Sequence, residues 1–76
     1  MDDAKLDRLR SAYKAAVDSW ITTIRAEEAL VSARHSVAEL DLWEAAHFAA
    51  EDARRRAEAA KAAYEAGLRA EVFGIE

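Results

Sequence analysis

The amino-acid sequence predicts an all-α protein that folds as an antiparallel two-helix hairpin and pairs with a second copy as a homodimeric four-helix bundle. Two observations predict the helices. The 76-residue chain contains no proline and no glycine before Gly67, and residues 3 to 66 consist mainly of Ala, Leu, Glu, Lys and Arg, which are strong helix formers. A third observation, the small number of bulky apolar side chains, predicts the pairing.

The expected core is thin. Apolar residues make up 53% of the chain, but 20 of these 40 residues are alanine. A domain of this size with a thin core usually needs disulfides, a metal or oligomerisation for its stability. The absence of cysteine removes disulfides and thiolate metal sites. We therefore expect residues 1–76 to form a single domain that is a homo-oligomer, most simply a dimer.

The first helix is expected over residues 3–35. Asp2 and Asp3 suit its start, because carboxylates cap a helix N-terminus and interact favourably with the helix dipole. Large apolar residues then recur at steps of three and four, which places them on one face of a helix. A weaker second stripe passes through Leu30, so this helix is expected to contact more than one neighbour. The main stripe consists of Leu6, Leu9, Tyr13, Val17, Trp20, Ile21, Ile24 and Val31.

The turn is expected over residues 36–42, although neither glycine nor proline marks it. Ser36 with Glu39 fits a capping box, and Asp41 with Glu44 fits a second one, so two helix starts are open. The rhythm of the apolar residues also changes here. An unbroken helix over residues 3–70 would be roughly 100 Å long and would need sustained heptads, which the sequence lacks.

The second helix is expected over residues 42–70, followed by a short tail over residues 71–76. Its stripe at steps of three and four is mostly alanine. A chain folded at residues 38 and 39 would set large side chains of the first helix against small ones of the second, which permits close packing. The predicted pairs across the hairpin are Leu9 with Leu68, Tyr13 with Tyr64, and Trp20 with Ala57, and the predicted ion pairs along the second helix include Glu51 with Arg55 and Asp52 with Arg56.

These stripes define the residues expected to form the core and the dimer interface. The chain has no cysteine, no glycine-rich loop and no serine in a nucleophile-elbow context, so we expect no enzyme activity and no cofactor. The sequence favours a small self-associating protein that acts as a protein-interaction or assembly module. The expected core and interface residues are Leu9, Tyr13, Val17, Trp20, Ile24, Leu30, Val31, Tyr64 and Leu68.

An alternative hypothesis is a carboxylate and histidine metal site in the bundle. Glu44 and His47 have the Glu-x-x-His spacing that places both side chains on one helical face, as in bundles with dinuclear carboxylate sites. Glu28 and His35 fall in phase with the apolar stripe of the first helix, and the hairpin register would bring Glu28 near His47 and His35 near Glu44. Such a set would suit iron, manganese or zinc. The simpler interpretation is that these side chains lie near the turn and interact with helix ends.

The charge pattern argues against general affinity for nucleic acid. The net charge is −4, with both signs mixed along the chain. The one basic cluster, Arg54, Arg55 and Arg56, has acids close by in sequence and is expected to form a solvated, paired face. An RNA-binding hairpin dimer is therefore the weaker alternative. No apolar run approaches a membrane span and no signal peptide is recognisable, so we expect a cytoplasmic protein.

Two aromatic residues near the predicted turn, Trp43 and Phe48, have two possible roles. They could cover the end of the bundle, or, if exposed, they could anchor a heterologous protein partner, because aromatic side chains dominate interface hot spots. The apolar tail over residues 71–76 is expected to fold back on the bundle or to fray, the alternative being a docking peptide.

Overall fold

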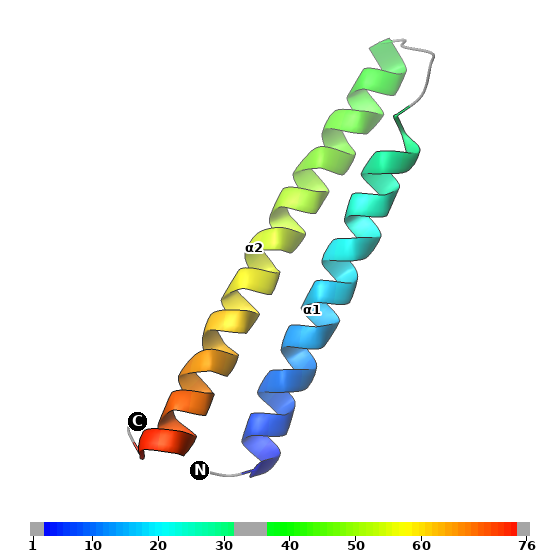
Figure 1. Ribbon diagram of the computed structural model, residues 1–76. Helices are drawn as coiled ribbons and strands as arrows, with labels where there is room; N and C mark the ends of the chain where they lie inside the picture. The colour runs from blue at the N-terminus through cyan, green and yellow to red at the C-terminus, as the bar shows by residue number, and fades with distance from the viewer. Residues whose placement is uncertain (1–2, 32–36, 75–76) are drawn as a thin grey trace.

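The computed structural model describes residues 3–31 and 37–74, which form two helices, α1 (Asp3–Ala29) and α2 (Val37–Phe73). The helices run antiparallel and lie side by side, so that the start of α1 and the end of α2 lie at one end of the molecule (Figure 1). The hairpin is narrow, with principal extents of 56 × 15 × 13 Å. The predicted all-α helical hairpin is confirmed.

The turn comes earlier in the chain than predicted. Helix α1 ends at Ala29 instead of residue 35, and its end is tightened by hydrogen bonds that Leu30 N donates to Glu27 O (3.1 Å) and Val31 N donates to Glu28 O (3.0 Å). Helix α2 begins at Val37, so the prediction that residues 37–42 belong to the turn is wrong.

Helix α2 begins at the position that the first of the two predicted capping boxes, Ser36 with Glu39, gives for a helix start. Val37 comes directly after Ser36, which itself lies outside the described residues, and Asp41 lies within the helix. Residues 38–40, Ala, Glu and Leu, are strong helix formers, and no glycine or proline interrupts them. The change of apolar rhythm near residue 37 therefore coincides with the start of a second helix, and the prediction that the chain is not one unbroken helix is confirmed.

Helix α2 also extends three residues beyond the predicted end at residue 70. It ends at Phe73, and Gly74 follows with a φ of 65° while its N–H donates to Ala70 O at 2.8 Å. A glycine in the left-handed region is the usual residue just after a helix, because it has no Cβ to clash there. Residues 71–73 of the predicted tail are thus helical.

The two helices meet along a seam of small residues on α2. Within the described residues, the buried side chains are those of Ala50, Ala53 and Ala57, of which Ala57 is 3% exposed, and Gly67 is buried as well. No large side chain in this part of the chain is fully buried. Alanine and glycine permit the helix axes to approach closely, but they bury little apolar area.

Large side chains of α1 pack against this seam close to the predicted register. The rings of Tyr13 and Tyr64 lie 6.1 Å apart between centroids with their planes at 32°, which confirms that pair. A Cβ built on Gly67 would lie 2.8 Å from Leu9 Cδ1, so the leucine occupies the space above this glycine, one residue before the predicted partner Leu68.

Replacing Ala57 by leucine tests the close approach of the helices. The added side chain has no room at a position that is 3% exposed, so it forces the helices apart and lowers the free energy of unfolding by about 1 to 3 kcal/mol. Urea denaturation followed by circular dichroism measures this change. The matched control is Ala59→Leu at an exposed helical position, for which a change within about 0.5 kcal/mol is expected. Equal effects of the two substitutions would contradict the packing described here.

Candidate functional site

Exposed apolar side chains gather in the half of the hairpin next to the turn. In the part of the chain that the structure describes, eleven large apolar side chains are exposed, and nine of them lie between residues 21 and 48. Neither helix, over its described residues, contains an apolar stretch of the length needed to cross a membrane. The nine are Ile21, Ile24, Leu30, Val31, Val37, Leu40, Leu42, Trp43 and Phe48, and the other two are Val72 and Phe73.

An apolar hollow of about 300 Å³ opens at the turn end of the molecule. Leu30 and Val31, which follow α1, form one wall, and Leu40 and Trp43 of α2 form the other, together with Glu39. Trp43 is 38% exposed at this place. The hollow has the size and chemistry to receive apolar side chains of another molecule.

A second hollow, of about 260 Å³, lies nearer the middle of the hairpin. Its walls include Val17 of α1 and Lys61 of α2, so these two residues lie on the same side of the seam. Ile24 comes seven residues, or about two helical turns, after Val17, and Trp43 comes eighteen residues, or five turns, before Lys61. Ile24 and Trp43 therefore lie on this side as well.

We call this side, in its turn half, the apolar face. On α1 it continues through Ile21, one turn after Val17, and on α2 through Leu40, one turn before Trp43. Several of these residues were predicted to lie in a core or an interface, and in the single hairpin they are exposed or half buried. The apolar face comprises Val17, Ile21, Ile24, Leu40 and Trp43.

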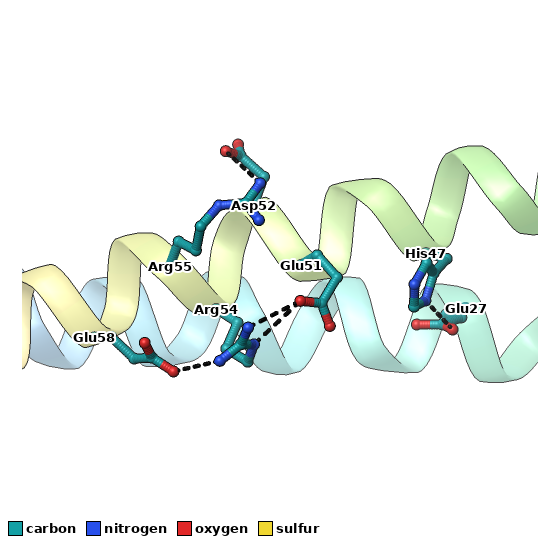
Figure 2. Close-up of polar contacts among 7 residues, drawn as sticks. All are labelled: Glu27, His47, Glu51, Asp52, Arg54, Arg55 and Glu58. Atoms are coloured by element: carbon teal, nitrogen blue, oxygen red, sulfur yellow. Dashed lines mark hydrogen bonds and ion pairs between the residues drawn. The ribbon is translucent and has the colours of Figure 1, made fainter.

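A polar contact between His47 and Glu27 joins the two helices beside the apolar face. His47 Nδ1 lies 3.3 Å from Glu27 Oε1, and Figure 2 shows the histidine of α2 pointing toward the glutamate of α1. The imidazole also stacks on Trp43, with ring centroids 5.7 Å apart and planes at 15°. The expectation that Glu28 lies near His47 is wrong by one residue: Glu27 takes that place, and Glu28 is exposed.

Of the predicted metal ligands, those that the structure describes are not brought together. Among the described residues, no group of three His, Asp or Glu side chains is arranged to hold a metal ion. Glu44 is exposed, and the carboxylate beside His47 is that of Glu27. His35 lies outside the described residues. The iron, manganese or zinc site stays a prediction of the sequence. Of its four predicted ligands, Glu28 does not take the expected place beside His47, because Glu27 lies there.

Arg54 forms ion pairs with two acids of its own helix. Its Nη2 lies 3.0 Å from Glu51 Oε2 and its Nη1 lies 2.5 Å from Glu58 Oε1 (Figure 2). The hydrogen bond from Arg54 and its positive charge lower the pKa of Glu51 below its ordinary value. The hydrogen bond to Glu51 and the charges of both acids raise the pKa of Arg54. The predicted pair of Glu51 with Arg55 is replaced by this three-residue cluster.

The other two arginines of the basic cluster share a single acid. Arg56 Nη2 lies 2.7 Å from Asp52 Oδ2, as predicted, and Arg55 Nη2 lies 4.0 Å from Asp52 Oδ1. Figure 2 shows Asp52 and Arg55 on the side of α2 that points away from α1. Each of the three arginines therefore has a carboxylate within 4.0 Å, which is the paired, solvated face that the sequence favoured over a phosphate-binding surface.

Comparison with protein-family models, with curated proteins and with solved structures finds no match to this chain. Any functional inference therefore rests on the residues of the chain and on their arrangement. The most distinctive feature is the exposed apolar surface of the turn half, because isolated apolar side chains at a surface are ordinary whereas large contiguous apolar patches are uncommon on monomeric proteins.

The pKa of Glu51 predicts how the contribution of Arg54 to stability depends on pH. A lowered pKa in the folded state means that the pair stabilises the fold above the ordinary glutamate pKa of 4.5, and that this stabilisation is lost as the pH falls through the folded value. The melting temperature of Arg54→Met should thus lie below that of the unsubstituted chain at neutral pH, by a small amount because the pair is partly exposed and screened by salt.

As the pH falls through the lowered pKa of Glu51 and this carboxylate becomes protonated, the difference should shrink. Thermal melts of both chains across the pH range measure it. The matched control is Arg55→Met, whose nearest carboxylate is 4.0 Å away and which should show a smaller difference at neutral pH. A difference for Arg54→Met that stays constant across the pH range would contradict the assignment of the pair.

Proposed function

We propose that this protein is a self-associating helical hairpin that acts as a protein-interaction or assembly module, with two copies forming a four-helix bundle. One observation carries the proposal: within the described residues the buried side chains are alanines, while eleven large apolar side chains are exposed. Full burial of a Val, Leu, Ile or Phe side chain stabilises a protein by about 1.5 to 3 kcal/mol, and alanine contributes far less. The apolar residues that can add stability are thus still exposed to water in the single hairpin.

A second copy supplies the missing burial without any further element. In a four-helix bundle each helix packs against two neighbours, and α1 has large residues for both, since Leu9 and Tyr13 lie against α2 while Ile21 and Ile24 are exposed beside the seam. Homodimers with two-fold symmetry present the same surface twice, so one self-complementary apolar face is sufficient. Ordering the backbone alone costs about 1 to 2 kcal/mol per residue. The burial of apolar area between two copies helps to offset this cost.

The exposed aromatic residues support an interaction role over catalysis. Trp43 is 38% exposed and Phe48 is 65% exposed, and aromatic side chains are enriched in the centres of protein interfaces. Binding of a different protein through these residues is the alternative within the same class. A purified chain that dimerises by itself favours self-association, and a purified monomer favours the other protein.

Sedimentation equilibrium over a range of concentrations tests the proposed self-association. The purified chain, with a monomer mass of 8.4 kDa, should sediment with twice that mass at micromolar concentration. Its melting temperature should rise with protein concentration, because association stabilises only the folded state. A folded monomer at micromolar concentration, with a melting temperature that does not depend on concentration, would exclude the proposal.

A further inference from the structure

We propose that two copies pair in parallel through the apolar face, with their turn ends side by side and the two-fold axis along the length of the hairpin. This inference rests on the proposed function, because it specifies the geometry of that association. Three properties of the hairpin lead to it: the area of its side, the position of its exposed apolar residues, and the position of its charges.

The area of the hairpin requires contact along most of its length. One side measures 56 by 15 Å between Cα positions, which is about 800 Å². A stable interface between two proteins typically buries about 800 Å² on each partner. Two hairpins that overlap only in their turn halves would bury about half of this, whereas full-length overlap reaches the required area. Two full-length arrangements remain, parallel and antiparallel.

The exposed apolar residues favour the parallel arrangement. The apolar face occupies the turn half, whereas in the other half of the hairpin the only exposed large apolar side chains among the described residues are Val72 and Phe73, at the end of α2. Parallel pairing therefore places apolar face on apolar face, with Ile24 and Trp43 of one copy against the same residues of the other. Antiparallel pairing would place each apolar face against the half of the partner that carries none of these side chains.

The charges on the same side of the hairpin oppose the antiparallel arrangement. Glu58 and Lys61 line the second hollow together with Val17, and Arg54 lies one helical turn before Glu58. An antiparallel partner would cover these groups with apolar side chains and remove them from water, which costs free energy. In the parallel pair, the charged half of each copy lies beside the charged half of the other, where polar groups and water can solvate both.

The absence of cysteine makes the orientation directly measurable, because one introduced cysteine is the single thiol in the chain. Asp41 and Ala66 are exposed positions on α2. They are 25 residues apart, which is about seven helical turns, so they lie on the same side of α2 and about 38 Å apart along its axis. Labels on Asp41→Cys and Ala66→Cys therefore report the two ends of the hairpin.

Resonance energy transfer between labelled copies distinguishes the two arrangements. Parallel pairing predicts stronger transfer in a mixture of donor-labelled and acceptor-labelled Asp41→Cys than in a mixture of donor-labelled Asp41→Cys and acceptor-labelled Ala66→Cys. Equal transfer in the two mixtures, or the reverse order, would overturn the parallel geometry while leaving the dimer intact. A monomer in sedimentation would instead overturn the proposed function, so the two failures are distinct.

Two lysine substitutions test which side of the hairpin is covered. Ile24→Lys places a charge in the apolar face and should weaken association at least about tenfold. Ala59→Lys is the matched control, because Ala59 is exposed and follows Ala57 by two residues, or about 200° around the helix, which puts it on the opposite side of α2 from the seam. Its dissociation constant should stay close to that of the unsubstituted chain. Equal weakening by both substitutions would overturn the assignment of the face.

Discussion

Helices α1 and α2 approach each other closely along a seam of alanines, and this close approach decides which side chains are buried. Ala50, Ala53 and Ala57 have little side-chain volume, so the helices can lie next to each other over their length (Figure 1). The same small volume limits the apolar area that the contact removes from water. Large residues of α1 are therefore half buried at the seam, and those beside it stay exposed.

The distribution of residue types along the hairpin follows from this close approach. In the half near the chain ends, Leu9 over Gly67 and Tyr13 beside Tyr64 supply bulk at the seam, and charged residues cover the surface. In the turn half, the bulk of the apolar residues lies outside the seam, around the hollow that Trp43 and Leu40 help to form. The turn half therefore has the larger exposed apolar surface, with nine exposed large apolar side chains against two, Val72 and Phe73, among the described residues of the other half.

The sequence was sufficient to predict the hairpin and much of its register, for physical reasons that particular residues show. A chain of helix-forming residues without proline has little choice of secondary structure. Folding such a chain at residues 38 and 39 sets Tyr13 opposite Tyr64, and these two rings are in contact in the structure. The position of the turn could not be predicted, because two capping boxes competed and neither glycine nor proline selected one. Helix propensity within residues 37–42 favoured the earlier start.

The candidate sites were harder to predict than the fold. One residue along a helix turns a side chain by about 100°, so the difference between Glu27 and Glu28 beside His47 was below the accuracy of a register inferred from the sequence. The exposure of Ile24 and Trp43 was equally invisible, because an apolar stripe has the same pattern whether it faces a helix of its own chain or a second copy. The two cases differ in how much of the stripe the other helix of the hairpin covers. The small side chains of the alanine seam leave Ile24 and Trp43 partly uncovered.

The most direct test of whether the hairpin needs a second copy is the helix content of the purified chain on dilution. Far-ultraviolet circular dichroism at constant temperature measures it. If the alanine seam alone is too weak to hold the hairpin, helix content falls as the protein is diluted below the dissociation constant of the dimer, and it recovers on concentration. Helix content that stays constant down to the lowest measurable concentration, in a chain shown to be monomeric there, would contradict the claim that the seam needs a second copy.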